Sequence, residues 1–456
     1  MPYQPQSGDI TMALAGEAMI SRGLTAYREQ RFLGIRDIFQ QADVGYANGE
    51  MLFHNYENWP TFNSQTWMRC DPRFIKDLQW LGVNLVSCAN NHGFDFGENG
   101  VLTNICNLDE AGLVHAGSGR NYAEALAPAY LETANGRVAL VSATSSSRPH
   151  SRAGEQRRDM NGRPGVNLIR WVNEWTVDGQ TYDALTNMAE AFNWRQRMPR
   201  WWLSGYGFSA DSHEVVYLPD RNLLGVGSED PAARFVRGSS FERHTRMFQP
   251  DVERNLQSVK DACRMADWVI FSIHNHEGGQ HDDEPSEHIQ WLARAVIDAG
   301  ADAVIGHGPH VDRGIEIYNG RPIFYSLGNF IMQNDAVERT PQDALAMYGL
   351  GHENTPADFY EARAASAAHP ERTDGEDPGP GWWSAIARVS FEGKRLRQVR
   401  LHPLEFGFGL PRSQFGRPML AEGKIAQLAL DRFKRLSEPF GTCIRIDGGT
   451  GVIDGG

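Results

Sequence analysis

Short apolar runs recur along this 456-residue chain and are separated by amphipathic segments. Five of the runs have the length and composition of buried strands, at residues 11–16, 83–89, 137–144, 268–273 and 302–307. Helical patterns alternate with them, at residues 72–82, 98–112 and 286–300. Strands that alternate with helices predict an α/β layered domain in which polar side chains gather at strand ends.

The pattern changes after the fifth apolar run. Two strand-like stretches within residues 314–330 meet at Asn319-Gly320, a dipeptide typical of a type I′ hairpin turn. A further hairpin is predicted around Gly393. Because hairpins join antiparallel strands while helical crossovers join parallel ones, we expect mixed sheets.

Two segments interrupt this scheme and divide the chain. Residues 145–245 are rich in Arg, Trp, Ser and Gly with weak periodicity, which predicts an inserted lid or subdomain, and the polar residues 335–381 predict a surface loop. The core is then expected to comprise residues 8–144 and 246–334. A C-terminal hairpin and helix in residues 382–456 are expected to complete it.

The overall charge and the cysteine content exclude several classes of protein. The chain carries 57 Asp and Glu against 44 Lys and Arg, so it lacks the basic excess that nucleic-acid binding requires. No apolar run is long enough for a membrane span, and the first residues do not resemble a secretion signal. Five cysteines without a C-x-x-C pair are typical of a reducing compartment. We expect a cytoplasmic enzyme without a membrane anchor.

Five polar motifs follow predicted strands. They read AGEAMISR, YANGEM, ANNHGFDFGENG, SIHNHEGG and GHGPH. Carboxylate, imidazole and amide side chains together form a mixed nitrogen and oxygen ligand set, which suits zinc, manganese or iron better than calcium or magnesium. Open α/β sheets place ligands at strand ends, so the five motifs together favour a site.

Taken singly, each of these residues also has a structural explanation. A histidine after a strand is usually hydrogen-bonded within the fold, and Glu50 suits the first turn of a helix. Asn90-Asn91 suits a turn, because asparagine tolerates left-handed backbone conformations. The coincidence of all five motifs at strand ends is what favours the functional interpretation.

Resemblance to a known family is carried by three segments: NNHGFDFGENGVLTNICNLDEAGLVHAGSGRN, DAGADAVIGHGPHVDRGIEIYNGRPIFYSLGNF and GRPGVNLIR. They resemble signatures of the CapA/PgsA family of capsule poly-γ-glutamate synthesis proteins, over roughly residues 10–330. The family's domain is similar to that of calcineurin-like metallophosphoesterases. The resemblance therefore implies an αββα sandwich with mixed sheets and one or two divalent transition metal ions (Zn, Mn or Fe).

The resemblance also implies roles for particular residues. In the phosphoesterase scheme two acids follow the first two strands, an Asn ligand precedes a His that faces the leaving group, and later histidines complete the set. The implied metal ligands are Glu17, Glu50, Asn91, His274, His307 and His310. The histidine that follows the Asn ligand is His92, the implied general acid.

The chain departs from the family pattern at several positions. Gly16-Glu17 replaces the usual Gly-Asp, and Met19 stands where a histidine is usual. The usual H-W-G is H-N-H here, so His276 replaces a glycine. Residues two apart in an extended strand share a face, which predicts that His276 restores the missing imidazole. Glu277 and Arg22 are further candidates for a ligand or for a supporting role.

Two expectations concern catalysis and the substrate. Asp95 is expected either to orient His92 or to cap the following helix. Arg148, Arg152 and Arg163 lie in the insertion, and arginine suits bidentate capture of a carboxylate. The alternative for these arginines is a solvated loop whose charges pair with surface acids.

Three functions fit these features. The first is a metal-dependent hydrolase that cleaves an amide, peptide-like or ester bond in a small or peptide-like carboxylated substrate. The second is a metallophosphoesterase. The third is a non-hydrolytic accessory of poly-γ-glutamate synthesis, which the expected lack of a membrane anchor disfavours. Because one fold supports many functions, the site has to decide among them.

Overall fold

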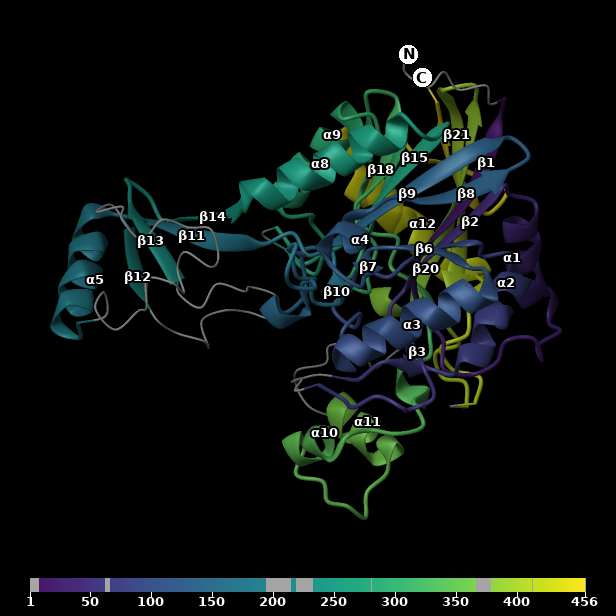
Figure 1. Ribbon diagram of the computed structural model, residues 1–456. Coiled ribbons are helices and arrows are strands. Elements are labelled where there is room, and N and C mark those ends of the chain that lie inside the picture. The colour runs from purple at the N-terminus through teal and green to yellow at the C-terminus, as the bar shows by residue number, and fades with distance from the viewer. Residues whose placement is uncertain are drawn as a thin grey trace.

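Two mixed β-sheets pack face to face, and helices cover their outer faces (Figure 1). The computed structural model describes residues 8–61, 66–193, 215–218, 233–279, 281–365, 379–411 and 413–455. This arrangement confirms the predicted α/β sandwich with mixed sheets. Among the described helices, none is both long enough and apolar enough to cross a bilayer.

The larger sheet is built around β1, in the order β23-β24-β21-β20-β1-β2-β5-β6, with β19 also paired to β1 and β22 to β21. Strands β1, β2, β5 and β6 are parallel to one another, whereas β20 is antiparallel to β1. The strands are β1 (Ile10–Met19), β2 (Val44–Gly49), β5 (Leu85–Ser87), β6 (Val114–Ala116), β19 (Asn329–Met332), β20 (Trp383–Glu392), β21 (Arg395–Glu405), β22 (Met419–Leu420), β23 (Arg445–Asp447) and β24 (Thr450–Asp454).

The smaller sheet runs β17-β18-β16-β15-β9-β8. Its central strands β9, β15, β16 and β18 are parallel, and its two edge strands are antiparallel to their neighbours. The turn between β17 and β18 has φ of 48° at Asn319 and 71° at Gly320, which confirms the predicted hairpin. The strands are β8 (Ala129–Thr133), β9 (Gly136–Thr144), β15 (Trp268–His274), β16 (Ala303–His307), β17 (Ile315–Tyr318) and β18 (Arg321–Phe324).

Side chains that alternate along β1 divide the core into layers. Met12 and Leu14 face the smaller sheet, whereas Ala13 and Ala15 face the outer helices. A strand buried on both faces reads as a continuous apolar run, which is why β1 was visible in the sequence. The larger sheet is covered by α1 (Gln30–Gln40), α2 (Ile75–Leu81) and α3 (Gly97–Ala111), and the smaller by α8 (Gln249–Cys263) and α9 (Glu287–Asp298).

The C-terminal segment completes the core, as the sequence predicts. Strands β20 and β21 form the hairpin around Gly393, whose φ is 52°. Helix α12 (Gly423–Ser437) packs Leu430 and Phe433 into the apolar layer between the sheets. Shorter elements are β3 (Leu52–Phe53), β4 (Arg69–Cys70), β7 (Ser118–Gly119), α4 (Tyr122–Leu126) and β10 (Gly165–Val166).

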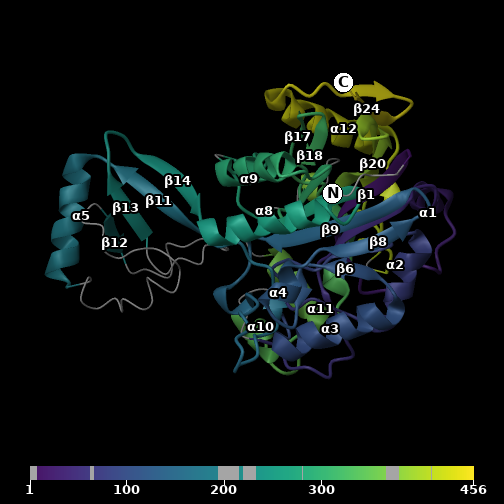
Figure 2. The ribbon, with the colours of Figure 1, turned by 45° about the horizontal axis from the view of Figure 1, so that its top comes forward.

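The insertion contains a small subdomain. Residues 145–170 stay against the core, where β10 pairs with β7. After them β11 (Trp171–Val177), β12 (Val215–Leu218), β13 (Ala233–Arg237) and β14 (Glu242–Met247) form a separate sheet, with α5 (Gly179–Ala191) packed against it. Figure 2 shows this sheet and α5 projecting from one side of the sandwich. Of the two predicted forms, the described residues therefore adopt the subdomain.

The prediction of a surface loop over residues 335–381 is corrected by the structure. The described part contains two helices, α10 (Gln342–Met347) and α11 (Pro356–Ala365). Leu345, Phe359 and Tyr360 join the apolar cluster beneath α1–α3. The composition of the segment is polar on average, but these few apolar anchors are enough to hold it on the core.

Gly16 lies where two backbone segments nearly touch. A β-carbon at Gly16 would lie 1.9 Å from the carbonyl oxygen of Gly328, which already accepts a hydrogen bond of 3.0 Å from the Glu17 amide. We therefore expect Gly16→Ala to lower the free energy of unfolding by roughly 1–3 kcal/mol. Urea denaturation measures this. Gly8→Ala is the control, because a β-carbon there meets no atom within 4 Å; equal stability of the two variants would contradict the prediction.

Candidate metal centre

Polar side chains from both sheets meet at the carboxyl ends of their parallel strands. Glu17 lies near the end of β1, and Glu50 directly follows β2. His274 and His307 are the last residues of β15 and β16, and they are register partners. Parallel neighbours end at the same edge of a sheet, and β1 contacts β16 across the sandwich. This is the convergence that the strand-end motifs predicted.

Glu17 is aimed by an irregularity in β1. The first half of the strand pairs with β20, whereas the second half pairs with β19, and the register to β2 shifts between Leu14 and Glu17. A shift of this kind redirects a side chain away from strict alternation. Asn48, on the neighbouring strand, donates a short hydrogen bond to the Glu17 carboxylate and fixes its orientation.

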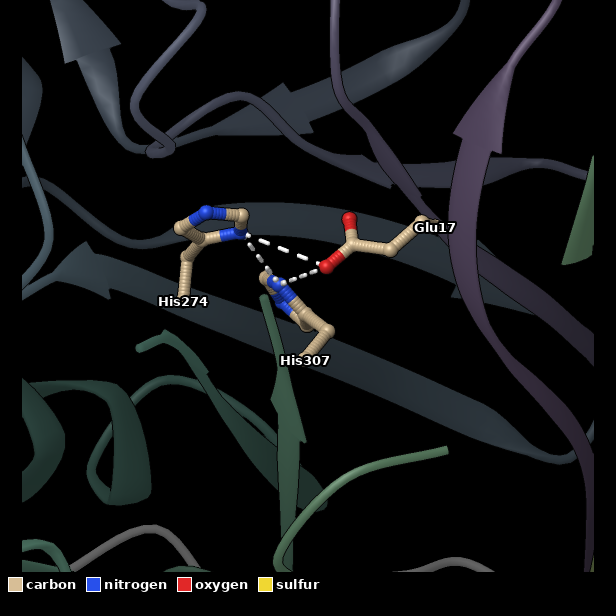
Figure 3. A group of neighbouring side chains, drawn as sticks. All are labelled: Glu17, His274 and His307. Carbon is tan, nitrogen blue, oxygen red and sulfur yellow. Dashed lines mark hydrogen bonds and ion pairs between the residues drawn. The ribbon is translucent and has the colours of Figure 1, made fainter. Parts of the chain in front are cut away.

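Glu17, His274 and His307 form the first group of potential ligands (Figure 3). Glu17 Oε1 lies 3.5 Å from His274 Nδ1 and 3.7 Å from His307 Nδ1, and the two Nδ1 atoms are 3.1 Å apart. All three side chains are fully buried. The other ring nitrogen of His307 lies 2.8 Å from Ser272 Oγ and 3.1 Å from Tyr46 Oη, so Nδ1 is the atom left to face the group.

Glu50, His274 and His276 form the second group. His274 Nε2 lies 3.1 Å from His276 Nε2 and 3.9 Å from Glu50 Oε1. His310 Nε2 lies 3.8 Å from the same Glu50 oxygen. The structure thus places His276 beside His274, as the sequence predicts, while Met19 lies in the apolar core at 2% exposure.

Burial gives both groups unusual electrostatics. It raises the pKa of Glu17 to about 7, and burial together with the nearby Glu17 charge raises the pKa of Glu50 well above its usual range. Burial lowers the pKa of His307 to about 3 and holds that of His274 well below its usual value. The imidazoles are therefore neutral, which is the form that binds a metal.

Several oxygen atoms of the site have no hydrogen-bond partner although they are buried. They are Glu17 Oε1, both carboxylate oxygens of Glu50, and Asn91 Oδ1. Buried polar atoms in proteins are nearly always paired, and a buried carboxylate needs a compensating charge. A divalent cation would satisfy the oxygens of Glu17 and Glu50 together with the neutral imidazoles, so the residues present fit a transition metal.

His92 and Asp95 form a pair next to the second group. His92 Nδ1 donates to Asp95 Oδ2 at 2.6 Å, and the Met68 amide donates to the same oxygen at 2.7 Å. His92 Nε2 then lies 4.0 Å from Glu50 Oε1. Asp95 does not cap α3, because the residue before that helix is Phe96. Of its two predicted roles, the contacts of Asp95 match the one that orients His92.

Two of the further candidates turn away from the metal centre. The Glu277 carboxylate accepts hydrogen bonds from Ser145 Oγ at 2.7 Å and Ser146 Oγ at 2.5 Å. The Arg22 guanidinium donates to the carbonyl oxygen of Phe415 at 2.8 Å. Within the described part of the chain, Glu277 belongs to neither group of potential ligands, and the contacts of Glu277 and Arg22 match the supporting role of the two predicted.

The three predicted substrate arginines lie in different surroundings. Arg148 lines a small pocket together with Asn91 and Asp95. Arg152 pairs with the fully buried Asp251 at 3.2 Å, and its guanidinium lies over the Tyr122 ring. Arg163 is exposed and donates to the Arg152 carbonyl oxygen at 2.7 Å. Only Arg148 of these three lines the pocket beside the metal centre.

Three residues that support the site, Asn329, Tyr46 and Ser272, were not found by sequence reasoning, and the first of them holds the predicted residue His310. His310 has a φ of 59°, and its Nδ1 lies 3.0 Å from Asn329 Oδ1. Asn329 Nδ2 also donates to the His310 carbonyl oxygen at 3.2 Å, so this one side chain holds both ends of a strained residue. Tyr46 and Ser272 are likewise inward-facing strand residues. Their positions in the sequence are typical of ordinary core residues of a strand, so the hydrophobic pattern gives no indication that they contact the site.

Comparison with known proteins places the chain in a family. A model of the family described as "Bacterial capsule synthesis protein PGA_cap" matches residues 8–334. The chain belongs to this family. Two uncharacterized proteins of Sinorhizobium fredii are each 35% identical over 460 residues, covering 97% of this chain and 92% of theirs. The PGA biosynthesis protein CapA of Bacillus subtilis is 25% identical over 370 residues, covering 78% of this chain and 73% of its own.

A Mycobacterium tuberculosis relative carries a different description. It is named a probable polyglutamine synthesis accessory protein, and it is 27% identical over 266 residues, covering 58% of this chain and 49% of its own. The matches to CapA proteins confirm the resemblance to the CapA/PgsA family. The metal centre described above lies within the matched part of this PGA_cap member, because all of its potential ligands fall between residues 8 and 334.

If His276 is a ligand in this PGA_cap member, its removal must weaken metal binding. We expect His276→Ala to lower the affinity for Zn²⁺ or Mn²⁺ by at least about tenfold, since changes even to residues that only support a ligand cost that much. Competition with a chromophoric chelator measures the affinity. His281→Ala, in the loop that follows, replaces an exposed histidine and should bind like the wild type. Unchanged binding by His276→Ala would refute the compensation for Met19.

Proposed function

We propose that this protein is a metal-dependent hydrolase that cleaves an amide, peptide-like or ester bond in a carboxylated substrate. The observation that carries the proposal is the shared edge at which Glu17, Glu50 and His274 meet with unpartnered buried carboxylate oxygens. The His92–Asp95 pair beside them supplies a proton-transfer group within reach of the same space. Ligands and a general acid at one place are what hydrolysis requires.

The residues that would hold a metal ion are those of the two groups, namely Glu17, Glu50, His274, His276 and His307, with His310 and Asn91 at the periphery. A divalent transition metal, zinc, manganese or iron, supplies Lewis acidity and activates water at neutral pH. Tyr46 and Ser272 hold the His307 ring in place through its other nitrogen. Asn48 does the same for Glu17.

His92 is the proposed general acid. Its Nδ1 is occupied by Asp95, so Nε2 is the atom that exchanges a proton with the departing amine or alkoxide. Asp95 is itself fixed by the Met68 amide, which prevents the imidazole from turning. A fixed imidazole whose free nitrogen faces the centre is the arrangement that general acids use.

Arg148 is the proposed contact for the substrate carboxylate. It lines the pocket that also includes Asn91, Ser147 and Ser151. The guanidinium suits a carboxylate, which it can hold with two parallel hydrogen bonds. Ser151 Oγ donates to the Arg148 carbonyl oxygen at 2.7 Å and pairs with the Ser147 hydroxyl, so the two serines hold the backbone that carries this guanidinium. Since Asn91 is a proposed metal ligand, a carboxylate in this pocket would place a neighbouring bond of the substrate close to the centre.

A role in polymer synthesis without hydrolysis is the second candidate. It is supported by the names of relatives, a PGA biosynthesis protein and a probable polyglutamine synthesis accessory protein. In that case the same carboxylate pocket would bind polymer rather than cleave it. A metallophosphoesterase activity, which the ligand set also permits, is a third possibility that the substrate panel below separates.

Mutations distinguish the proposed metal ligand Glu50 from the proposed general acid His92. We expect Glu50→Gln to lose bound metal and with it turnover, because it removes a charge from the donor set. His92→Ala should keep the metal and lose about 10²–10⁴-fold in kcat. Metal analysis and steady-state kinetics on the same samples measure both. His115→Ala, whose ring pairs with Asp109, is the control. Turnover by His92→Ala at the wild-type rate would contradict the general-acid role.

Substrate class is tested with Arg148 and three probes: a carboxylated amide, its neutral counterpart and bis-nitrophenyl phosphate. We expect Arg148→Met to raise KM for the carboxylated amide by about tenfold or more, the value of one charge-assisted hydrogen bond, without affecting the neutral amide. Arg157→Met removes a highly exposed arginine paired with Asp159 and serves as control. Hydrolysis of the phosphodiester alone would favour the phosphoesterase, and metal binding without any turnover would favour the accessory role.

A further inference from the structure

One buried arginine connects the two loops that carry the last histidines of the site. Arg313 is fully buried and follows His310 by three residues. Its Nη1 donates to Asn275 Oδ1 at 2.7 Å, its Nη2 to the His276 carbonyl oxygen at 3.4 Å, and its Nε to the Asp282 carbonyl oxygen at 3.1 Å. A single guanidinium therefore spans the chain from Asn275 to Asp282.

The opposite side of the same turn is held by serines. Ser146 Oγ accepts a hydrogen bond of 2.6 Å from the His276 amide while it donates to Glu277. The backbone of His276 is thus held at its amide by Ser146 and at its carbonyl by Arg313. Strand β15 ends at His274, so no ladder of β-sheet hydrogen bonds fixes His276. These side chains take over that role.

We propose that Arg313 is a positioning residue that sets metal affinity by fixing His276 beside His274. The inference rests on the proposed metal-dependent function. Arg313 acts through Asn275 and through the carbonyl group of His276, not through a ligand side chain. Residues that orient ligands from behind usually alter metal affinity by about 10–100-fold when they are replaced.

Arg313 also lies near the Glu277 carboxylate. Its role could therefore be to balance that negative charge, and the experiment has to distinguish this role from the positioning of His276. The positive charge of Arg313 favours the charged form of Glu277, against the burial that raises the Glu277 pKa. If the guanidinium served only to balance this carboxylate, removing both charges together would restore the site. If it holds the turn, removing both charges restores the balance but leaves His276 unfixed.

The experiment measures Zn²⁺ affinity by chelator competition on the full chain, together with the visible spectrum of the Co²⁺-loaded protein. The variants are Arg313→Met, Arg313→Lys and the double variant Arg313→Met with Glu277→Gln. Lysine keeps the charge but lacks the planar fork that reaches both Asn275 and the His276 carbonyl. Arg417→Met is the matched control, because Arg417 is also buried, at 3% exposure, but pairs with Glu29 near α1.

We expect Zn²⁺ affinity to fall about 10–100-fold in Arg313→Met and in the double variant, with a changed Co²⁺ spectrum. In Arg313→Lys the Zn²⁺ affinity should fall by at least about threefold, and this variant keeps the test valid if the methionine variant does not fold. Wild-type affinity in Arg313→Met or Arg313→Lys, or recovery in the double variant, would overturn the positioning role alone. Absence of Zn²⁺ binding by the wild type would overturn the metal-dependent function as well.

Discussion

Two acids, Glu17 and Glu50, lie fully buried where the ends of both sheets meet, and this burial raises the pKa of both because it disfavours the charged form. Burying even one unpaired carboxylate costs several kcal/mol, on the order of what a whole domain has to spare. The surrounding imidazoles do not provide the compensating charge, because burial keeps His274 and His307 neutral. A bound cation would supply the compensating charge and stabilise the ionised form of both acids, and metal binding would then be coupled to folding.

The sequence located most of this centre because most ligand candidates lie within two residues of a strand end; Asn91 and His310 lie four and three residues beyond one. Apolar runs mark strands, and the residue after a buried parallel strand lies at the edge of the sheet where neighbouring strands also end. Glu17, Glu50, His274 and His307 were all placed by this rule. The same reasoning predicted the mixed sheets, because the Asn319-Gly320 dipeptide indicates a hairpin within an otherwise parallel pattern.

His276 shows where the reasoning from periodicity was incomplete. It was predicted to follow His274 because alternate residues of a strand share a face, yet β15 ends at His274. Its position depends instead on Arg313, 37 residues later, and on Ser146, 130 residues earlier. Hydrogen bonds between such distant residues leave no trace in local periodicity. For the same reason α10 and α11 were missed, since their few apolar anchors pack against a cluster built by distant segments.

The arginines of the insertion have different roles, because two of them share one buried acid as their partner. Arg170 makes a two-point contact with Asp251, at 2.8 and 3.0 Å, and Arg152 binds the same carboxylate. The Phe248 amide donates to the Arg170 carbonyl oxygen at 2.7 Å, so these contacts join the point where the chain leaves the core to the point where it returns. Asp251 is fully buried, and a buried acid with two arginines anchors the base of the subdomain. Two of the arginines in this stretch thus hold the insertion in place, while Arg148 lies beside the metal centre. The spacing of arginines along the sequence could not separate these roles, because the acid that distinguishes them lies 99 residues from Arg152.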